Sequence, residues 1–328
     1  MKIILYSGTT SYEVTQIVDT VTWSGEYTQV ARKLEFGVIV NPNDPNIPKI
    51  PIKVGMKVKL LQADNKEIFM GVIFDVNRRS SENIFKILAY DLSIYLLKNE
   101  GTYKFTKSTP LNITSKICKD FGITLGNVAN PDIKVTKKFF GVCLYDIIMT
   151  GYTIASKSNG KKYMPLFLNG KLDVIQKGDT RLKIYFDSKY NLIDLNASES
   201  LEDMVNTVQI IDKDGNIKDT VSNGDWVKEF GKFQKVYKQE ENVDAKTQAK
   251  NMLKGTTKKI SIEGIGDTTC ITGYSVIVKD AISGKNGLFY IDSDNHSWSN
   301  GAYSIDLTLN FEKIMDEKES GEDEESKK

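Results

Sequence analysis

Strict alternation of apolar and polar residues near both ends of the chain is the feature that most constrains its fold. The apolar members are Val54, Met56, Val58 and Leu60 in the first run, and Tyr303, Ile305, Leu307, Leu309 and Phe311 in the second. A period of two residues places each set on one face of a β-strand. We therefore expect half-buried strands and a mainly β fold.

The first 95 residues are predicted to form a β domain. Apolar runs at 69–76 and 84–90 flank the turn-like stretch 78–83, which indicates an antiparallel pair. Four of the seven prolines fall in 41–51. That segment cannot donate a full ladder of backbone hydrogen bonds, so we expect an exposed loop there.

A change of pattern after residue 95 predicts a helix. Thr109 and Pro110 suit an N-cap and a first helical position, apolar residues recur every fourth position from Ile113 to Phe121, and Gly122 suits the C-terminal end.

A second helix is expected at about 143–156, followed by a hairpin of 163–168 with 172–175 that turns at Gly170. We assign residues 96–178 to a small α/β insert domain.

Residues 179–315 are predicted to form a second β domain. Asp212–Asn216, with Asp-Gly at its tip, indicates a hairpin between 208–211 and 217–221. One helix is expected at about 243–253. Further strands are expected at 260–262, 274–278 and 288–291, ahead of the alternating run described above.

The end of the chain, residues 316–328, contains no apolar side chain and many acids. Such a segment cannot bury enough surface to offset its ordering entropy. We predict that it is a disordered acidic tail.

Charge and cysteine content exclude several classes of protein. The 44 Lys and Arg against 43 Asp and Glu give a net charge of +1, so no nucleic-acid binding is expected. Cys118, Cys143 and Cys270 are odd in number and include no CxxC pair, which favours a reducing cytosol over a disulfide framework. No run reaches the ~18 apolar residues of a membrane span, and the short apolar start is interpreted as a first strand.

A catalytic centre is hard to build from this sequence. His296 is the only histidine, so any Ser/His or Cys/His nucleophile must use it. We interpret it instead as a loop or strand-end residue that hydrogen-bonds locally. A zinc site would need His296 and all three cysteines at a spacing that matches no known pattern, so buried structural cysteines are favoured.

Two loops superficially suggest ligand binding. Asp212–Asn216 differs from a calcium loop because its glycine is fourth and Asn223 stands where a glutamate is required, so a tight hairpin turn is favoured. Gly264–Gly266 has no third glycine and no βαβ context, and it is interpreted as a turn between strands.

The remaining options for chemistry are equally unspecific. Trp23, Trp226 and Trp298 are expected in the core more than in sugar stacking. Among 43 acidic residues the sequence selects no glycosidase pair. We predict no catalytic, cofactor-binding or metal-binding residues, no cofactor and no enzymatic activity.

The order of these parts, with several short segments, resembles the XkdQ-like baseplate hub proteins of PBSX-type prophages and related contractile tails. The resemblance extends over about residues 50–312. The segments that carry it are Lys66–Ile73, Ala89–Asn99, Phe105–Ile123, Phe230–Val236, Gly266–Asp267, Gly273–Asp280, Gly287–Ile291 and His296.

The resemblance implies an architecture rather than a reaction. Such hubs are related to phage tail hubs and to the N-terminal part of type VI spike proteins. They form homotrimers in which two β-barrel-like domains per chain give six near-equivalent barrels. A trimer can then join a sixfold tail tube to a threefold central spike. The implied partners are the tube protein, the spike protein and other baseplate subunits, and barrel edges are the candidate interfaces.

Two other readings stay open from the sequence alone. A tail-associated cell-wall hydrolase would need a clustered acid pair or Cys/His pair in a cleft, and a peptidoglycan-binding module would need exposed coplanar aromatic side chains. We favour a structural role for the insert. The particle, whether phage, defective prophage or tail-like bacteriocin, is expected to assemble in the bacterial cytoplasm and to leave the cell by lysis.

Overall fold

The computed structural model describes residues 1–79, 81–239 and 244–323, and their fold is mainly β. The chain divides into two compact units. One comprises Met1–Leu195 together with the residues from Ser261 onward, and the other is Asn196–Ile260. The predicted fold class, mainly β with a small α/β part, is confirmed.

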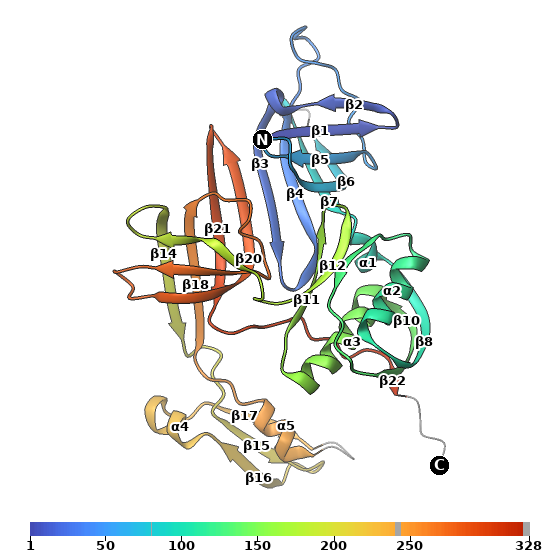
Figure 1. Ribbon diagram of the computed structural model, residues 1–328. Helices are drawn as coiled ribbons and strands as arrows, with labels where there is room; N and C mark the ends of the chain where they lie inside the picture. The colour runs from blue at the N-terminus through green and yellow to red at the C-terminus, as the bar shows by residue number, and fades with distance from the viewer. Residues whose placement is uncertain (80, 240–243, 324–328) are drawn as a thin grey trace. The chain divides into compact units, whose positions relative to one another are not determined.

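The largest sheet has thirteen strands (Figure 1). Its strands are β1 (Lys2–Ser7), β2 (Thr10–Glu13), β3 (Val18–Glu26), β4 (Gln29–Ile39), β5 (Lys57–Leu61), β6 (Glu67–Arg78), β7 (Ile84–Asp91), β13 (Arg181–Asp187), β14 (Leu192–Ser200), β18 (Thr257–Ile265), β19 (Ser275–Lys279), β20 (Asn286–Ser299) and β21 (Ala302–Asn310). A short 3₁₀ turn, η1 (Thr15–Ile17), precedes β3.

The order of these strands joins the two ends of the chain. The main path runs β14-β18-β21-β20-β3-β4-β7-β6-β5-β1-β2, and β19 links β13 to β20. The antiparallel β20–β3 pair, with His296 opposite Trp23, therefore connects the two predicted β domains in one sheet. Within the described ranges these pairings form an open path. The division at residues 95, 178 and 315 stays a prediction.

Alternation predicted the buried faces of these strands well. Met56, Val58 and Leu60 of the first run are buried, and so are Ile305, Leu307 and Leu309 of the second. Val54 lies ahead of β5 and is 58% exposed, and Phe311 lies beyond β21 and is 46% exposed, so the predicted burial of these two was wrong. The proline-rich segment 41–51, which was predicted to be a loop, forms no strand.

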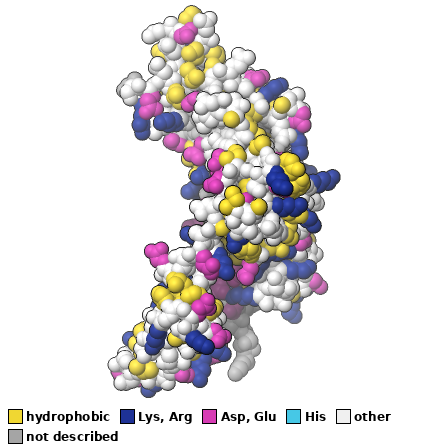
Figure 2. Space-filling view, turned by 90° about the vertical axis from the view of Figure 1, so that its left-hand side faces the viewer, with side chains coloured by type: hydrophobic (Ala, Val, Ile, Leu, Met, Phe, Trp, Pro, Cys, Tyr) yellow, Lys and Arg dark blue, Asp and Glu magenta, His cyan; other side chains and the backbone are white. Residues whose placement is uncertain are grey.

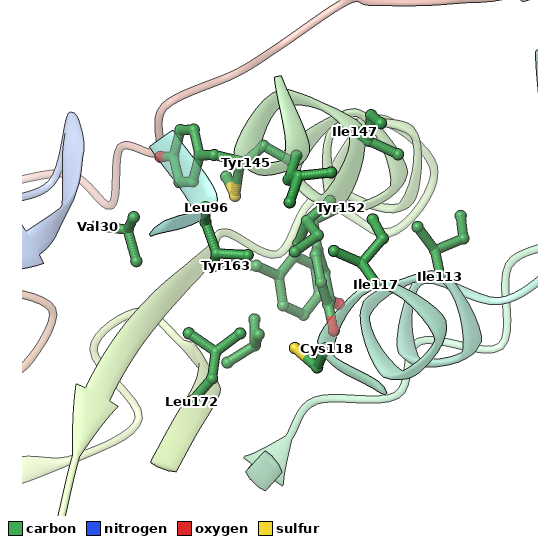
Figure 3. Close-up of a cluster of buried hydrophobic side chains, with 14 of the residues drawn as sticks. Val30, Leu96, Ile113, Ile117, Cys118, Tyr145, Ile147, Tyr152, Tyr163 and Leu172 are labelled. Atoms are coloured by element: carbon green, nitrogen blue, oxygen red, sulfur yellow. The ribbon is translucent and has the colours of Figure 1, made fainter. Parts of the chain in front are cut away.

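The α/β part consists of three helices and two small sheets around one apolar core (Figures 1 and 3). Its elements are α1 (Ile94–Lys98), β8 (Glu100–Ser108), α2 (Pro110–Asp120), β9 (Leu125–Val128), β10 (Val135–Cys143), α3 (Leu144–Asn159), β11 (Tyr163–Leu168), β12 (Lys171–Gln176) and β22 (Glu322–Asp323). One sheet has the order β22-β10-β8 and the other β11-β12-β9.

Helix α3 is the centre of this core. Figure 3 shows Ile113 and Ile117 of α2 turned towards Tyr152 of α3, which packs on Tyr163 of β11 at 5.1 Å between ring centroids. The predicted caps of α2 are confirmed: the Thr109 side chain accepts from the backbone N–H of Asn112, and Gly122 follows the helix in a left-handed conformation. Helix α3 runs three residues beyond its predicted end and stops at the left-handed Gly160, which the sequence analysis did not single out.

The smaller unit is built on a three-stranded sheet. Its elements are β15 (Thr207–Ile211), β16 (Ile217–Ser222), α4 (Gly224–Phe230), β17 (Gln234–Lys238) and α5 (Ala245–Asn251). The predicted hairpin is confirmed as β15 and β16, and β17 pairs in parallel with β15. The prediction of one helix in this region was wrong, because sequence periodicity missed the seven-residue α4. The predicted start of α5 at Val243 lies outside the described residues.

The prediction of a disordered acidic tail was wrong for residues 316–323. Residues 316–323 lie against α3 and β10: the backbone N–H of Lys318 donates to Thr153, and Lys162 pairs with Glu317 at 2.6 Å. Composition predicted disorder because it counted only apolar burial, whereas hydrogen bonds and opposite charges hold this segment. Residues 324–328 lie outside the described part of the chain.

Candidate functional site: the β20 junction and the open sheet edges

Strand β20 is the joint of the large sheet. It pairs with β19 up to Tyr290 and with β3 from Ser293 onward, while β21 lies along its other edge. The register with β21 shifts between Ile291 and Ser293, so Asp292 occupies a bulge. A bulge re-aims a side chain and bends the strand, which suits a strand that changes partners.

The first ionic centre of this junction joins Arg32 of β4 to Asp294 of β20. Both side chains are buried, and the guanidinium contacts both carboxylate oxygens. Asp294 also accepts from the Thr272 hydroxyl and backbone N–H, each at 2.6 Å. Burial alone would raise the pKa of Asp294, but Arg32 and the hydrogen bond from His296 outweigh it and hold that pKa well below its usual range.

His296 lies in the same centre and is fully buried. Its Nε2 is 3.2 Å from the carbonyl oxygen of Cys270 and 3.3 Å from a carboxylate oxygen of Asp294. Both neighbours accept, so this nitrogen carries a proton, and Nδ1 lies 2.8 Å from the Tyr303 hydroxyl. The predicted local hydrogen bonding is present, but the predicted loop or strand-end position was wrong, because β20 continues through the histidine.

The second ionic centre joins Lys177 to the bulge residue Asp292. Lys177 is fully buried, and its ammonium contacts the Asp292 carboxylate and lies 4.8 Å from the centre of the Tyr27 ring. Asn310 of β21 donates to the other carboxylate oxygen at 3.1 Å. Burial lowers the pKa of Lys177, while its pairing with Asp292 favours the charged form.

Asp91 completes the polar groups beneath β4. It accepts from the backbone N–H of Arg32 at 3.1 Å and from Ser93, whose hydroxyl also donates to the carbonyl of Val30. Burial raises the pKa of Asp91 to about 6, although these hydrogen bonds favour its charged form. Its role is to fix the end of β7 against the start of β4.

These centres position strands and offer no path for a substrate. Arg32, Asp294 and His296 are each at most 2% exposed. Among the described residues, no group of three or more His, Cys, Asp or Glu side chains is arranged to hold a metal ion. A buried ion pair of this kind specifies which strands meet, because leaving either charge unpaired is costly.

The sequence contained a signal for this junction that was missed because the analysis of alternation considered only apolar residues. Asp292, Asp294, His296 and Trp298 recur at every second position of one strand. Charged side chains on the inward face of a strand indicate buried partners, and those partners, Arg32 and Lys177, lie far away in the sequence.

The three cysteines are free thiols. Cys118 and Cys270 are buried, and burial raises the pKa of each to about 12. Cys143 is half-buried, with its sulfur 3.4 Å from the carbonyl oxygen of Leu96. The Cys118 and Cys270 thiols therefore stay protonated at neutral pH and pack as small apolar groups.

The two candidate ligand loops have structural roles. Asp212 turns back on its own loop and accepts from the backbone N–H groups of Asp214 and Asn216, as a hairpin turn requires. Gly264 and Gly266 pack so closely against the rings of Phe186 and Tyr303 that an added Cβ would lie 2.5 Å from each. Gly264 lies within β18, so the prediction of a turn there was wrong.

Of the three tryptophans, Trp23 is the one that lies fully in the core, as expected. Trp23 is 2% exposed and packs between Arg32, 4.1 Å from its ring, and His296 at 4.7 Å. Trp298 is half-buried and stacks on Tyr303 at 4.4 Å between ring centroids. Trp226 of the smaller unit is also half-buried, beside Gly255. These three side chains do not form an exposed stacking platform.

Open edges and exposed apolar side chains are the surface features that suit docking. Among the described residues, the main path ends at β14 and at β2, and β13 pairs with β19 alone. Tyr185, Ile277 and Leu288 stand opposite one another across β13, β19 and β20. Tyr185 and Leu288 are more than 40% exposed. Figure 2, which faces the side where β14 and β18 are drawn, shows apolar side chains between basic and acidic ones.

Comparison with known proteins identifies the family. The YqbQ-like family model matches residues 21–310. The chain belongs to the YqbQ-like family. It is 22% identical to the uncharacterized protein YqbQ of Bacillus subtilis over 304 residues, covering 89% of this chain and 92% of YqbQ. It is 21% identical to the phage-like element PBSX protein XkdQ of the same organism, covering 92% and 94%. The resemblance seen in the sequence is confirmed.

Solved structures extend the likeness to the fold. The 43 kDa tail protein of prophage MuSo2 from Shewanella oneidensis has a TM-score of 0.70 at 16% identity, covering 94% of this chain and 97% of its own. A tail protein from Neisseria meningitidis scores 0.63 at 14% identity, with 94% and 95% covered. An E. coli component of the type VI secretion system scores 0.51 at 10% identity, with 93% and 76% covered. The fold of this YqbQ-like chain is thus that of prophage tail proteins.

Among the residues that the structure describes, no helix is long and apolar enough to cross a membrane.

Proposed function

We propose that this chain is a structural baseplate hub of a contractile phage tail or tail-like particle. In this role it forms a homotrimer that joins the sixfold tail tube to the threefold central spike. The observation that carries the proposal is the likeness to the MuSo2 tail protein, which extends over nearly the full length of both chains. A likeness confined to one module would leave room for a different role.

The geometry supports an assembly role. Open strand edges present unpaired backbone N–H and C=O groups, which are templates for pairing with another chain. A hub must present them at fixed positions, since a closed ring leaves little tolerance for error. The buried Arg32–Asp294 and Lys177–Asp292 pairs fix β20 against its neighbours and so suit this demand.

The alternative, a tail-associated protein that binds or cleaves peptidoglycan, has less support. His296 is enclosed by Tyr303 and Asp294, and the Cys118 and Cys270 thiols are buried. A hydrolase would need a reactive group open to a polymeric substrate. The proposal therefore assigns this chain to assembly rather than to covalent chemistry.

Light scattering over a wide concentration range, with and without the candidate spike protein, tests the hub role. A trimer, alone or on adding the spike, is the expected result. A stable monomer that ignores the spike would overturn it, and release of soluble fragments from purified peptidoglycan would favour the hydrolase instead. The spike protein alone serves as the control for any release of fragments that it causes itself.

A further inference from the structure

The acidic segment 316–323 runs along α3 in an extended conformation. The backbone N–H of Lys318 donates to the hydroxyl of Thr153 at 3.0 Å, and that of Ser320 donates to Thr150 at 3.1 Å. A step of two residues along the segment, from Lys318 to Ser320, thus corresponds to a step of three residues along the helix, from Thr153 back to Thr150. The segment and the helix therefore run in opposite directions. Helix residues three apart share a face, so α3 presents a row of hydroxyl acceptors to an extended backbone.

The same segment then adds a strand to a sheet. In β22, Glu322 stands opposite Lys138 and Asp323 opposite Lys137 of β10. The other edge of β10 is occupied by β8. The incoming segment therefore pairs with the free edge of β10, a mode by which proteins recognise extended peptides.

The charges of the two surfaces are complementary. Lys162 pairs with Glu317 at 2.6 Å and Lys137 with Asp323 at 2.9 Å. Lys157 pairs with Glu319. Three lysines on the α/β part thus face Glu317, Glu319 and Asp323 of the segment. Such a surface favours an acidic segment over a basic or neutral one. We call the surface formed by Thr150, Thr153, Ser156, Lys137, Lys157, Lys162 and the β10 edge the α3–β10 groove.

One position of the groove is not used by the segment. Ser156 continues the row of Thr150 and Thr153 by three more residues and is only 3% exposed. Its hydroxyl has no hydrogen-bond partner among the described residues. Unpaired buried hydroxyls are costly, so the groove has capacity for a further backbone donor.

The segment is held by contacts that open easily. Glu319 and Asp323 are 71% and 86% exposed in their side chains. Exposed ion pairs of this kind contribute about 0–1 kcal/mol each. The apolar anchor, Met315, precedes the segment and is buried in the core around α3. The segment can therefore leave the groove without unfolding the α/β part.

We propose that the α3–β10 groove binds an acidic extended segment in trans, and that its occupant in the assembled particle is segment 316–323 of a second copy of this chain. This inference rests on the proposed function, because it is the proposed trimer that brings copies of the chain together. The hydrogen bonds and ion pairs named above all join segment 316–323 to the groove, so exchange of the segment between copies preserves them. Neighbouring copies in a closed ring supply the segment at high effective concentration.

Cysteine cross-linking in the full chain distinguishes the two arrangements. Lys157→Cys is placed in one copy and Glu319→Cys in another, and the differently tagged copies are co-expressed and oxidised. A disulfide-linked heterodimer is the expected result, because this cysteine pair meets only when the segment of one copy lies on α3 of the other. Lys119→Cys on α2 replaces Lys157→Cys in the matched control and should give no heterodimer.

The remaining arms separate this inference from the hub proposal. The chain carrying both substitutions reports pairing within one copy, and the unaltered chain reports any link through Cys143. A trimer by light scattering that gives only links within one copy overturns the exchange and leaves the hub role intact. A monomer without heterodimer overturns both. Absence of any link in the doubly substituted chain shows that the segment does not occupy the groove, and likewise overturns the inference.

A charge exchange between Lys162 and Glu317 gives a second test, read out with the same pair of cysteines. Glu317→Lys in the segment that carries Glu319→Cys should lower the yield of heterodimer, because Lys162 of the accepting copy then faces a lysine. Lys157 is then replaced by cysteine as before, and Lys162→Glu is added on the accepting copy, which should restore part of the heterodimer. Loss without any restoration would mean that the substitutions act on folding, and equal yield in all three samples would mean that charge does not select the segment. Either result contradicts recognition by the groove lysines.

Discussion

Ion pairs hold two regions of this protein, and the two sets differ in burial. At the β20 junction, Arg32 and Asp294 expose 3% and 0% of their side chains. At the α3–β10 groove, Lys157 and Glu319 expose 57% and 71%. The same pair of charges fixes a fold when it is buried and offers a reversible contact when it is exposed, because water competes for the exposed groups. The predictions below test this contrast.

The largest effect is expected at the buried junction. Asp294→Asn leaves the Arg32 guanidinium buried without a counter-charge and should lower the free energy of unfolding by about 3–5 kcal/mol. Urea unfolding followed by tryptophan fluorescence measures this change. The matched control, Arg32→Met with Asp294→Leu, removes both charges and should recover much of the loss. A loss below about 1 kcal/mol for Asp294→Asn would place the pair in the same class as the exposed ones.

A somewhat smaller loss is expected at the bulge of β20. Lys177→Met removes the ammonium from Asp292, but Asn310 still donates to that carboxylate. The free energy of unfolding should fall by about 2–4 kcal/mol. Lys313→Met, a partly exposed lysine over Tyr290, is the control and should change it much less. Equal effects from the two lysines would contradict the ranking by burial.

The pH dependence of stability sharpens the comparison within the buried region. The pKa of Asp91 is raised from 3.8 to about 6 in the fold. Its stabilising contribution is therefore complete below pH ~4 and is lost as the pH rises through ~6. Relative to Asp91→Asn, the wild-type chain should lose up to about 3 kcal/mol of unfolding free energy between pH 4 and pH 7. Parallel curves for the two proteins would contradict it.

The smallest effect is expected at the exposed groove. Glu319→Gln should lower the free energy of unfolding by less than about 1 kcal/mol, and 0.5 M salt should abolish the difference. Chemical unfolding at low and high salt measures both quantities. A salt-independent loss as large as that of Asp294→Asn would mean that the groove contacts belong to the rigid part of the fold.

Local signals predicted the elements that depend on local physics. The Thr109 cap, the buried Ile113 and Ile117 of α2 and the hairpin at Asp212–Asn216 all formed where capping, helical periodicity and turn chemistry placed them. The seven-residue α4 was missed because it is too short for periodicity to register. The β22 pairing was missed because two residues carry no strand pattern of their own.

The candidate site was less predictable than the fold. The sequence directed attention to His296 as a lone residue, whereas its role depends on Asp294, Tyr303 and the carbonyl of Cys270. Those partners come from neighbouring strands and a loop, and no spacing rule links them to Arg32 in β4. A charged residue at an inward position indicates that a partner exists but does not say which one.

By itself the sequence determined the mainly β class, the α/β part, the family resemblance, the caps of α2 and the hairpin of β15 and β16. Each of these follows from contacts between residues close in the chain or from the order of short motifs. Only the tertiary structure decided that β20 pairs with β3, that Arg32 and Lys177 neutralise the aspartates of β20, and that the acidic end occupies a groove on α3. These features join residues more than 100 positions apart, and the burial that makes a charge pair rigid or reversible exists only once the strands have met.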